Sequence, residues 1–160
     1  RLADAWTNRV DGLPIETPEE ALILASIVEK ETGGVEEVRT VASVFENRLR
    51  QGMRLQTDPT VIYGVTGGEG ILGRGLRQSE LRAETPYNTY VIQGLPPTPI
   101  ANPGLASIEA VLNPAETDYI FFVAKTLDPA DGHNFAVTLD EHNRNVAAYR
   151  ALEAQRDSNN

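Results

Sequence analysis

The segment that decides the fold is residues 17–34, TPEEALILASIVEKETGG. Thr17 suits the N-cap of a helix, Pro18 suits the first helical position, and Glu20 follows Thr17 by three residues, as a capping box requires. The pair Gly33–Gly34 is a signal for the end of a helix. Together these signals predict a helix that fills the segment up to the glycine pair.

Glu31 is the residue of this helix whose position indicates a candidate acid–base group. It shares a helix face with three apolar residues, Leu24, Ile27 and Val28. Desolvation among apolar neighbours and the negative C-terminal end of the helix dipole both disfavour a charged carboxylate, so the pKa of such a group rises. Glu29 lies on a smaller and more polar face. Periodicity alone still favours the alternative that EKE, residues 29–31, is a solvated run with helical salt bridges.

The composition excludes several classes of function. With 160 residues and 41% hydrophobic content, the chain is expected to form one domain over residues 1–160. A net charge of -9 argues against nucleic acid or an anionic membrane surface as the partner, whereas an uncharged polymer such as a glycan stays open. The absence of cysteine excludes disulfides, thiolate zinc sites and cysteine nucleophiles. No apolar run is long enough for a membrane span, so we expect no membrane contact by this domain.

The rest of the chain predicts an α+β fold, with a β-hairpin and a long loop-rich segment beside the helices. A second helix is expected over residues 35–51, and residues 53–104 are rich in glycine, proline and polar residues, which is typical of functional surface. Further elements are expected at residues 60–65, 78–81, 107–112, 119–125, 134–138 and about 140–157. The inner stripe of the last helix is expected to consist of Val146, Ala147, Tyr149 and Leu152.

Two histidines raise the alternative of a metal site. His133 and His142 stand near acidic and amide side chains, and histidine with carboxylates is a zinc ligand set. Their spacing matches neither a close helical pair nor HExxH, so a structural role is favoured, in which His142 and its neighbours cap the last helix. The glycine-rich residues 66–75 lack the Lys-Ser/Thr of a phosphate loop. We therefore predict no metal and no cofactor.

Several long strings of the chain carry a family resemblance. They are LASIVEKET (24–32), ASVFENRLRQGMRLQTDPTVIYG (42–64), TPYNTYVIQGLPPTPIANPG (85–104), and YIFFVAK (119–125) followed by GHNFAVTLDEHNRNV (132–146). In this order they resemble the endolytic murein transglycosylases of the MltG (YceG-like) family. The resemblance covers nearly all of residues 10–150.

The resemblance implies a catalytic domain with a lysozyme-like helical core. Such lyases cleave nascent peptidoglycan strands between N-acetylmuramic acid and N-acetylglucosamine without water and leave 1,6-anhydromuramoyl ends. By the same resemblance, Glu31 is the single catalytic acid and base, and Thr32 stands where related enzymes carry serine. Action is implied at the periplasmic or extracytoplasmic face of the inner membrane, beside cell-wall synthases (penicillin-binding proteins). A full-length member would carry an N-terminal membrane anchor and a LysM-like region that this chain does not contain.

Six polar or aromatic residues of the loop-rich segment are candidates for substrate contact. Flat rings stack on pyranose faces, and amide and hydroxyl groups pair with sugar hydroxyls. The candidates are Gln56, Tyr63, Tyr87, Asn88, Tyr90 and Asn102. Tyr87 and Asn88 also match the Tyr-Asn element that lytic transglycosylases are expected to have beside their glutamate. A purely structural loop is the alternative for Gln56 and for the proline-rich turn around Asn102.

Two other functions remain open at this point. One is a hydrolytic muramidase, in which Asp58 is the second carboxylate and water is the acceptor. The alternative interpretation of Asp58 is that it caps a helix that begins at Asp58-Pro59. The other function is a glycan-binding module without catalysis, in which the loop aromatics bind and Glu31 has no chemical role.

Overall fold

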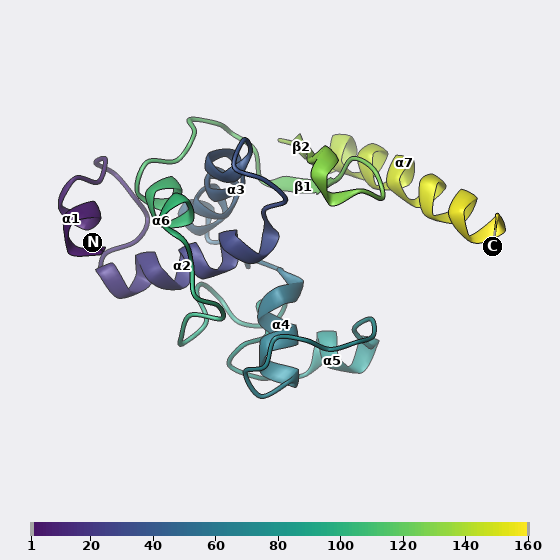
Figure 1. Cartoon of the computed structure of the whole chain (residues 1–160), viewed down its shortest axis with the longest axis horizontal. Helices are drawn as coiled ribbons and strands as arrows, with labels where there is room; N and C mark the ends of the chain where they lie inside the picture. Colours follow the sequence, from purple (N-terminus) through teal and green to yellow (C-terminus); the bar gives the residue numbers. More distant parts are fainter. Residues whose placement is uncertain (1, 160) are drawn as a thin grey trace.

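Helices and one small sheet make up the computed structural model, which describes residues 2–159 (Figure 1). The helices are α1 (Leu2–Thr7), α2 (Pro18–Glu31), α3 (Val38–Gln51), α4 (Asp58–Val65), α5 (Gln78–Arg82), α6 (Leu105–Leu112) and α7 (Leu139–Ser158). Strands β1 (Phe121–Ala124) and β2 (His133–Ala136) pair antiparallel, with Phe121 opposite Ala136, around a 3-10 turn (Pro129–Asp131). This mixture of helices with a two-stranded sheet confirms the α+β class.

Helix α2 forms the centre of the core and packs against α3 and α6. Almost its whole circumference is enclosed from residue 21 to residue 28, as expected of a helix that is apolar all round. The predicted cap is confirmed, because the Thr17 hydroxyl accepts from the Glu20 amide at 3.1 Å. The Glu20 carboxylate accepts a hydrogen bond from the amide of Glu16 at 2.8 Å. In a standard capping box it would accept from the amide of the N-cap residue, Thr17.

Helix α3 begins at Val38, three residues later than predicted. Residues 35–37 form a turn, in which the amide of Val38 bonds the carbonyl of Val35. The carboxylate of Glu37 accepts a hydrogen bond from the backbone amide of His133, a residue far along the chain, at 3.0 Å. At the other end, Gly52 adopts the left-handed conformation (φ 71°) that closes the helix as predicted.

One polar side of α3 holds the segment that leads from α6 into β1. Ser43 pairs with the Thr117 hydroxyl at 2.7 Å. Asn47 donates to the carbonyls of residues 117 and 119, each at 2.9 Å. Arg48 donates through Nε to the carbonyl of Ile120 at 2.7 Å. Because these bonds join residues about 70 positions apart, they fix the hairpin against the helical core.

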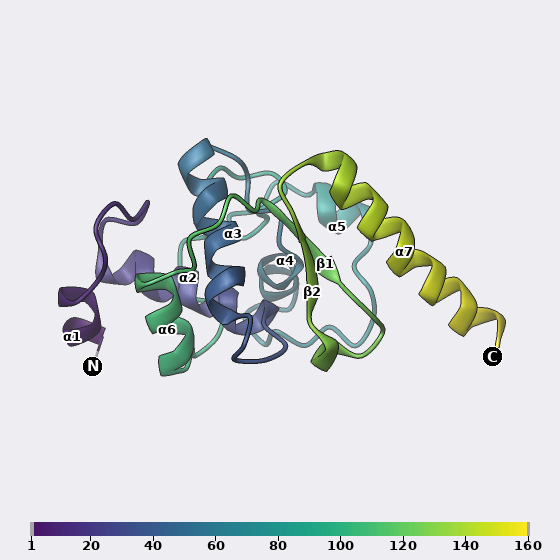
Figure 2. The same ribbon diagram turned by 90° about the horizontal axis from the view of Figure 1, so that it is seen from above.

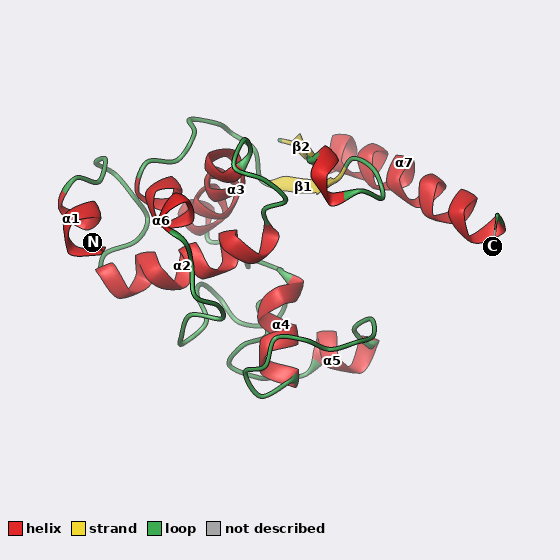
Figure 3. Ribbon diagram, in the orientation of Figure 1, coloured by secondary structure: helices red, strands yellow, loops and turns green. Residues whose placement is uncertain are grey.

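A buried threonine cluster joins the start of α4 to the loop before α6. The Thr89 hydroxyl accepts from the Thr57 amide and lies 2.9 Å from the Thr60 hydroxyl, and all three residues are enclosed. Figure 3 shows that the chain from α5 to α6 is loop throughout. The cluster therefore gives this irregular segment a fixed position beside α4.

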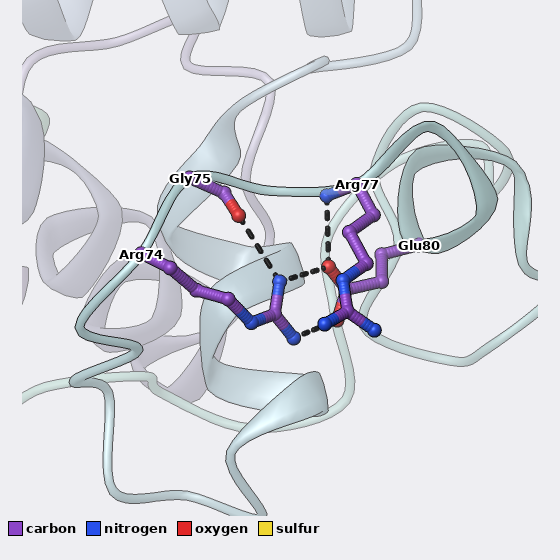
Figure 4. A network of polar contacts seen from close by, with 4 residues as sticks. All are labelled: Arg74, Gly75, Arg77 and Glu80. Atoms are coloured by element: carbon purple, nitrogen blue, oxygen red, sulfur yellow. Dashed lines mark hydrogen bonds and ion pairs between the residues drawn. The ribbon is translucent and has the colours of Figure 1, made fainter.

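The glycine-rich stretch between α4 and α5 is fixed by one charged network (Figure 4). Arg74 makes two hydrogen bonds to the carboxylate of Glu80, at 2.8 and 2.9 Å, and also donates to the carbonyl of Gly75. The amide of Arg77 bonds the same carboxylate at 2.8 Å. The hydrogen bonds from Arg74 hold the pKa of Glu80 well below its ordinary value.

Helix α7 extends away from the rest of the molecule in both views (Figures 1 and 2). The prediction of a buried inner stripe on this helix is wrong. Three of its residues are only half-buried, Val146, Tyr149 and Leu152, and Ala147 is exposed. The reason is that α7 contacts the narrow hairpin and not a second layer of helices. Its cap is Thr138, whose hydroxyl accepts from the amide of Glu141. Nowhere between residues 2 and 159 is a helix apolar and long enough to cross a bilayer.

A fully enclosed carboxyl group in α3, that of Glu46, has no hydrogen-bond partner at either oxygen. Burial raises its pKa from 4.5 to about 8, with a smaller opposing effect of Arg50. The folded protein therefore keeps a proton that the unfolded chain releases above pH 4.5, so the folded state loses stability as the pH rises toward 8.

We predict that Glu46→Gln removes this part of the pH dependence. In the wild type, the group lowers the free energy of unfolding by on the order of 5 kcal/mol between the two pKa values. Chemical denaturation at pH 5 and pH 8 measures the difference, with the exposed Glu36→Gln as control. An equal decline in the wild type and in Glu46→Gln would contradict the prediction.

Candidate active site

A cavity of about 440 Å³ lies where α2 ends, between α3, α4 and the hairpin. Its wall combines apolar side chains with six polar or charged ones. The lining residues are Glu31, Val44, Phe45, Arg48, Leu55, Gln56, Asp58, Tyr90, Ile120, Phe121, Phe122, Leu139 and His142. The cavity thus gathers residues from six separate parts of the chain around the end of one helix.

Glu31 is the last residue of α2 and is partly buried at the cavity wall. Desolvation raises the pKa of its carboxyl from 4.5 to about 7, and the neighbouring charge of Asp58 adds to the rise. The Thr57 hydroxyl opposes the shift, although it makes no hydrogen bond of standard geometry. Near neutral pH this carboxyl is therefore present in both protonated and ionised forms, as a group that gives and takes protons requires.

The two glutamates at the end of α2 differ in what they contact. The helix face that precedes Glu29 is also largely buried, because Ala25 and Ser26 are fully enclosed, so burial of the faces alone does not separate the two glutamates. Glu29 accepts from the amide of Gly104 at 2.7 Å and from the hydroxyl of Ser107 at 3.1 Å. The Glu29 carboxylate thus bonds the start of α6, whereas Glu31 lines the cavity.

A second carboxyl group, that of Asp58, lines the same cavity. The expectation that Asp58 caps α4 is wrong, because Thr57 is the N-cap residue and Asp58 is the first helical one. The Asp58 carboxylate instead accepts from the hydroxyl of Tyr90 at 2.5 Å. Burial and this bond to Asp58 raise the pKa of the Tyr90 phenol, which remains protonated and keeps the hydrogen bond.

Gln56 reaches the cavity through an unusual backbone conformation. Its φ of 51° makes it the one residue between 2 and 159, glycines apart, with a positive φ. Its amide bonds the carbonyl of Thr89 at 3.2 Å, which helps to hold this conformation. Backbone strain of this kind is concentrated at functional sites in proteins. The interpretation of Gln56 as a purely structural turn residue therefore explains less than a role in the cavity.

Arg48 is a cavity residue that we did not predict. Its Nε and Nη1 donate to the carbonyls of Ile120 and Arg54, at 2.7 and 2.8 Å, and Nη1 lies 3.4 Å from the side-chain oxygen of Gln56. Burial lowers the pKa of this guanidinium, which lies over the ring of Phe121. A sequence signal existed, since Arg48 continues the apolar spacing of Val41 and Val44 along α3 just as Glu31 does along α2.

His142 and its neighbours were expected to cap α7. This is wrong for His142 itself, whereas the Glu141 carboxylate accepts from the amide of Val137, just before the N-cap Thr138, at 3.3 Å. The ring of His142 stacks on Phe121, with the ring centres 4.8 Å apart, and lines the cavity. Burial, with a smaller contribution from Arg48, lowers its pKa, so the ring is neutral at neutral pH. The other histidine, His133, pairs with Glu37 at 3.1 Å outside this cavity. Within residues 2–159 no three His, Asp or Glu side chains gather in a way that could hold a metal ion.

The predicted contact residues are only partly brought together. Gln56 and Tyr90 line the cavity with Glu31, whereas Tyr63, Tyr87, Asn88 and Asn102 do not. Tyr63 and Tyr87 pack on each other, with ring centres 5.0 Å apart, on the α4 side of the molecule. Asn102 is exposed in the loop before α6.

Asn88 is fully enclosed, which gives it a different role from the predicted one. Its amide nitrogen donates to the carbonyls of Leu81 and Ala83, at 3.0 and 2.7 Å. Its side-chain oxygen accepts from the amide of Tyr90 at 3.0 Å. In this structure Asn88 therefore positions the loop that carries Tyr90 and has no free group for a ligand.

A larger hollow of about 880 Å³ lies between α1, α3 and α6, away from these residues. Its main cation, Arg39, is already bonded to the carbonyls of Asn113 and Pro114. The other polar side chains of this hollow are all exposed, namely Asp4, Asn8, Glu109 and Asn113. Because Glu31, Arg48 and Tyr90 are partly or fully buried around the smaller cavity, that cavity is the better candidate for chemistry.

Comparison with known proteins identifies relatives of this chain. The model of the YceG-like family matches residues 1–148. The endolytic murein transglycosylase of Bacillus subtilis (strain 168) is 42% identical over 128 residues, which cover 80% of this chain and 34% of that protein. The protein of the same name from Streptococcus pneumoniae serotype 2 (strain D39) is 35% identical over 139 residues, covering 83% of this chain and 24% of that protein.

A solved structure has a similar fold. A YceG-like protein from Listeria monocytogenes superposes with a TM-score of 0.69 at 42% identity, over 79% of this chain and 38% of that one. The chain thus spans about a third or less of the length of the two curated relatives described above.

We predict that Asp58→Asn lowers the pKa of Glu31, because it removes the negative charge that opposes ionisation. Titration of the Glu31 carboxyl by carbon-13 NMR measures the shift. Asp157→Asn, at the far end of α7, is the control and should leave the titration unchanged. A Glu31 pKa that stays the same or rises in Asp58→Asn would refute the electrostatic coupling.

Proposed function

The chain belongs to the YceG-like family, and we propose that it is the catalytic domain of an endolytic peptidoglycan lytic transglycosylase. The bond it cleaves joins N-acetylmuramic acid to N-acetylglucosamine in nascent glycan strands, and the product is a 1,6-anhydromuramoyl end. One observation carries this proposal: the carboxyl of Glu31, with its pKa raised to about 7, lies at a cavity large enough for sugar rings.

In the first step, protonated Glu31 donates its proton to the glycosidic oxygen. The bond between that oxygen and the anomeric carbon of the muramic residue breaks, and N-acetylglucosamine leaves with a new hydroxyl. The muramic ring is left as an oxocarbenium-like species. Burial supports this step because it keeps a large share of Glu31 protonated at neutral pH.

In the second step, the C6 hydroxyl of the same muramic residue attacks the anomeric carbon and closes the anhydro ring. Its proton passes to the carboxylate of Glu31, which returns to the protonated form. No water is consumed, and no enzyme nucleophile is needed. One carboxyl group therefore serves as acid and then as base, in contrast to the pair of carboxyl groups in ordinary glycosidases.

The other cavity residues have supporting roles in this proposal. The Asp58 carboxylate favours positive charge on the sugar ring and also keeps Glu31 protonated. Gln56 and Tyr90 contact the sugar from one wall, and Asn88 positions Tyr90 through its backbone amide. Tyr63, Tyr87 and Asn102 lie outside the cavity and would contact the strand only where it runs on past it.

The remaining parts of the proposal concern the whole protein. We propose that α2, α3 and α4 form a lysozyme-like core and that residues 1–160 are one catalytic domain. The substrate implies action at the periplasmic or extracytoplasmic face of the inner membrane, with membrane anchoring by a region outside this chain. Cell-wall synthases are the proposed protein partners, because they produce the nascent strands.

A second candidate function, a hydrolytic muramidase, has one observation in its favour. Asp58 lies in the same cavity as Glu31 and is a possible second carboxylate. The hydrogen bond from Tyr90 at 2.5 Å already uses this carboxylate, which argues against its acting as a nucleophile or base. Mass spectrometry of digested sacculi separates the two reactions, since hydrolysis gives reducing muramic ends and transglycosylation gives anhydro ends.

We predict that Glu31→Gln releases no anhydro-muropeptides but still binds glycan strands, because the shape of the side chain is kept and the proton is lost. The matched control is Glu29→Gln, two residues away. It should keep its activity and lose about 1 kcal/mol of stability, since it weakens the bonds to Gly104 and Ser107. Muropeptide analysis after digestion of sacculi provides the measurement.

Two outcomes would contradict the assignment of Glu31. Full activity of Glu31→Gln would move the catalytic role to another residue. Absence of product from the wild type, combined with glycan binding that Glu31→Gln does not alter, would support a non-catalytic glycan-binding module instead.

We also predict the pH dependence of kcat/KM for the wild type. The first step needs protonated Glu31, so activity should fall about tenfold per pH unit above about pH 7. In Asp58→Asn the start of this fall should move to lower pH, because the pKa of Glu31 is then lower. Assays with peptide-free glycan strands between pH 5 and pH 9 measure both profiles, and a fall that begins at the same pH in both proteins would count against the coupling.

A further inference from the structure

A second cavity, of about 180 Å³, adjoins the end of α2. Glu31 lines it as well as the first cavity, and no other residue lines both. The second cavity is enclosed by the last residues of α2, the turn between β1 and β2, and Tyr149 of α7. Glu31 therefore lies at the junction of two hollows.

The wall of the second cavity is held by close packing. A Cβ atom on Gly33 would lie 2.3 Å from the carbonyl oxygen of Pro129, so only glycine allows this approach of α2 to the turn. A Cβ atom on Gly132 would similarly lie 2.7 Å from the carboxylate of Glu37. The same carboxylate accepts the backbone amide of His133. The turn thus lies close against Gly33 after α2, and it also contacts Glu37, the residue that precedes α3, at Gly132 and His133.

Two side chains leave accessible groups free toward a ligand in this cavity, whereas the unpaired hydroxyl of Thr32 is enclosed. Tyr149 is half-buried at the cavity wall, and none of its atoms is bonded to another side chain among the described residues. Lys30 is exposed and has no acidic partner within residues 2–159. The Thr126 hydroxyl, by contrast, is already bonded to Asp131 at 2.6 Å. An aromatic ring beside an ammonium group suits a sugar ring with hydroxyl and carbonyl oxygens.

We propose that this second cavity binds the glycan strand on one side of the cleaved bond, while the first cavity binds it on the other. The inference rests on the proposed function, because a carboxyl that cuts within a strand needs space for a sugar on both sides. The position of Glu31 between the two hollows meets this need. This proposal also gives the middle of α7 a role in binding glycan, because Tyr149 of α7 lines the second cavity.

The test uses the two products of cleavage as separate ligands. One is an oligomer that ends in 1,6-anhydromuramic acid, and the other is an oligomer that begins with N-acetylglucosamine. Each should occupy a different side of Glu31. Dissociation constants for both are measured by calorimetry with Glu31→Gln, and again after adding Tyr149→Ala. The control is Arg150→Ala, an exposed neighbour on α7.

Tyr149→Ala should weaken the binding of one oligomer about tenfold and that of the other less than twofold, because it removes one ring contact on one side only. Arg150→Ala should change neither. Thermal unfolding of each variant checks that α7 stays folded. Equal loss for both oligomers, no loss for either, or no saturable binding of either oligomer would overturn the inference.

A second pair of variants tests the wall without touching Tyr149. Gly33→Ala forces the turn away from α2, whereas Gly34→Ala meets no atom within 4 Å. The first should weaken the same oligomer as Tyr149→Ala, and the second should weaken neither. Failure of the proposed function is seen separately, as the absence of anhydro product from the wild type, so the two failures can be distinguished.

Discussion

The desolvation of one carboxyl group, that of Glu31, is the interaction on which the rest of the site depends. Helix α2 is enclosed along most of its length and then ends at the wall of a cavity, so its last residue lies between the core and open space. Burial and the charge of Asp58 raise its pKa to about 7. The same packing that stabilises the helix therefore gives Glu31 the proton affinity that acid and base chemistry requires.

The walls around Glu31 come from irregular chain that is held in place by buried polar contacts. The cluster of Thr57, Thr60 and Thr89 joins the start of α4 to the loop that carries Tyr90. On the opposite side, Arg48 bonds the carbonyl of Ile120 and so fixes the hairpin. A segment rich in glycine and proline can form a defined wall because its buried polar groups are nearly all paired.

Local patterns predicted the helices well and the assembled site only in part. The cap at Thr17 and the glycine at position 52 follow local rules, and both were confirmed. Glu31, Gln56 and Tyr90 were predicted and lie together. Arg48, His142 and Tyr149 were missed or given other roles, because their positions depend on contacts with residues far along the chain. Asn88 was expected to contact a ligand. The residue type alone does not show that its side-chain amide instead bonds the backbone of its own loop.

Glu46 shows why a shifted pKa alone does not identify a catalytic group. Like Glu31, it is a glutamate whose pKa burial raises, and the shift of Glu46 is the larger of the two. Glu46 is fully enclosed and lines neither of the cavities beside Glu31, so no ligand in them can exchange a proton with it. Glu31 lines two cavities and has a second carboxylate beside it. Access to a substrate, and not the size of the shift, is therefore what distinguishes the proposed acid from a buried group that only lowers stability at high pH.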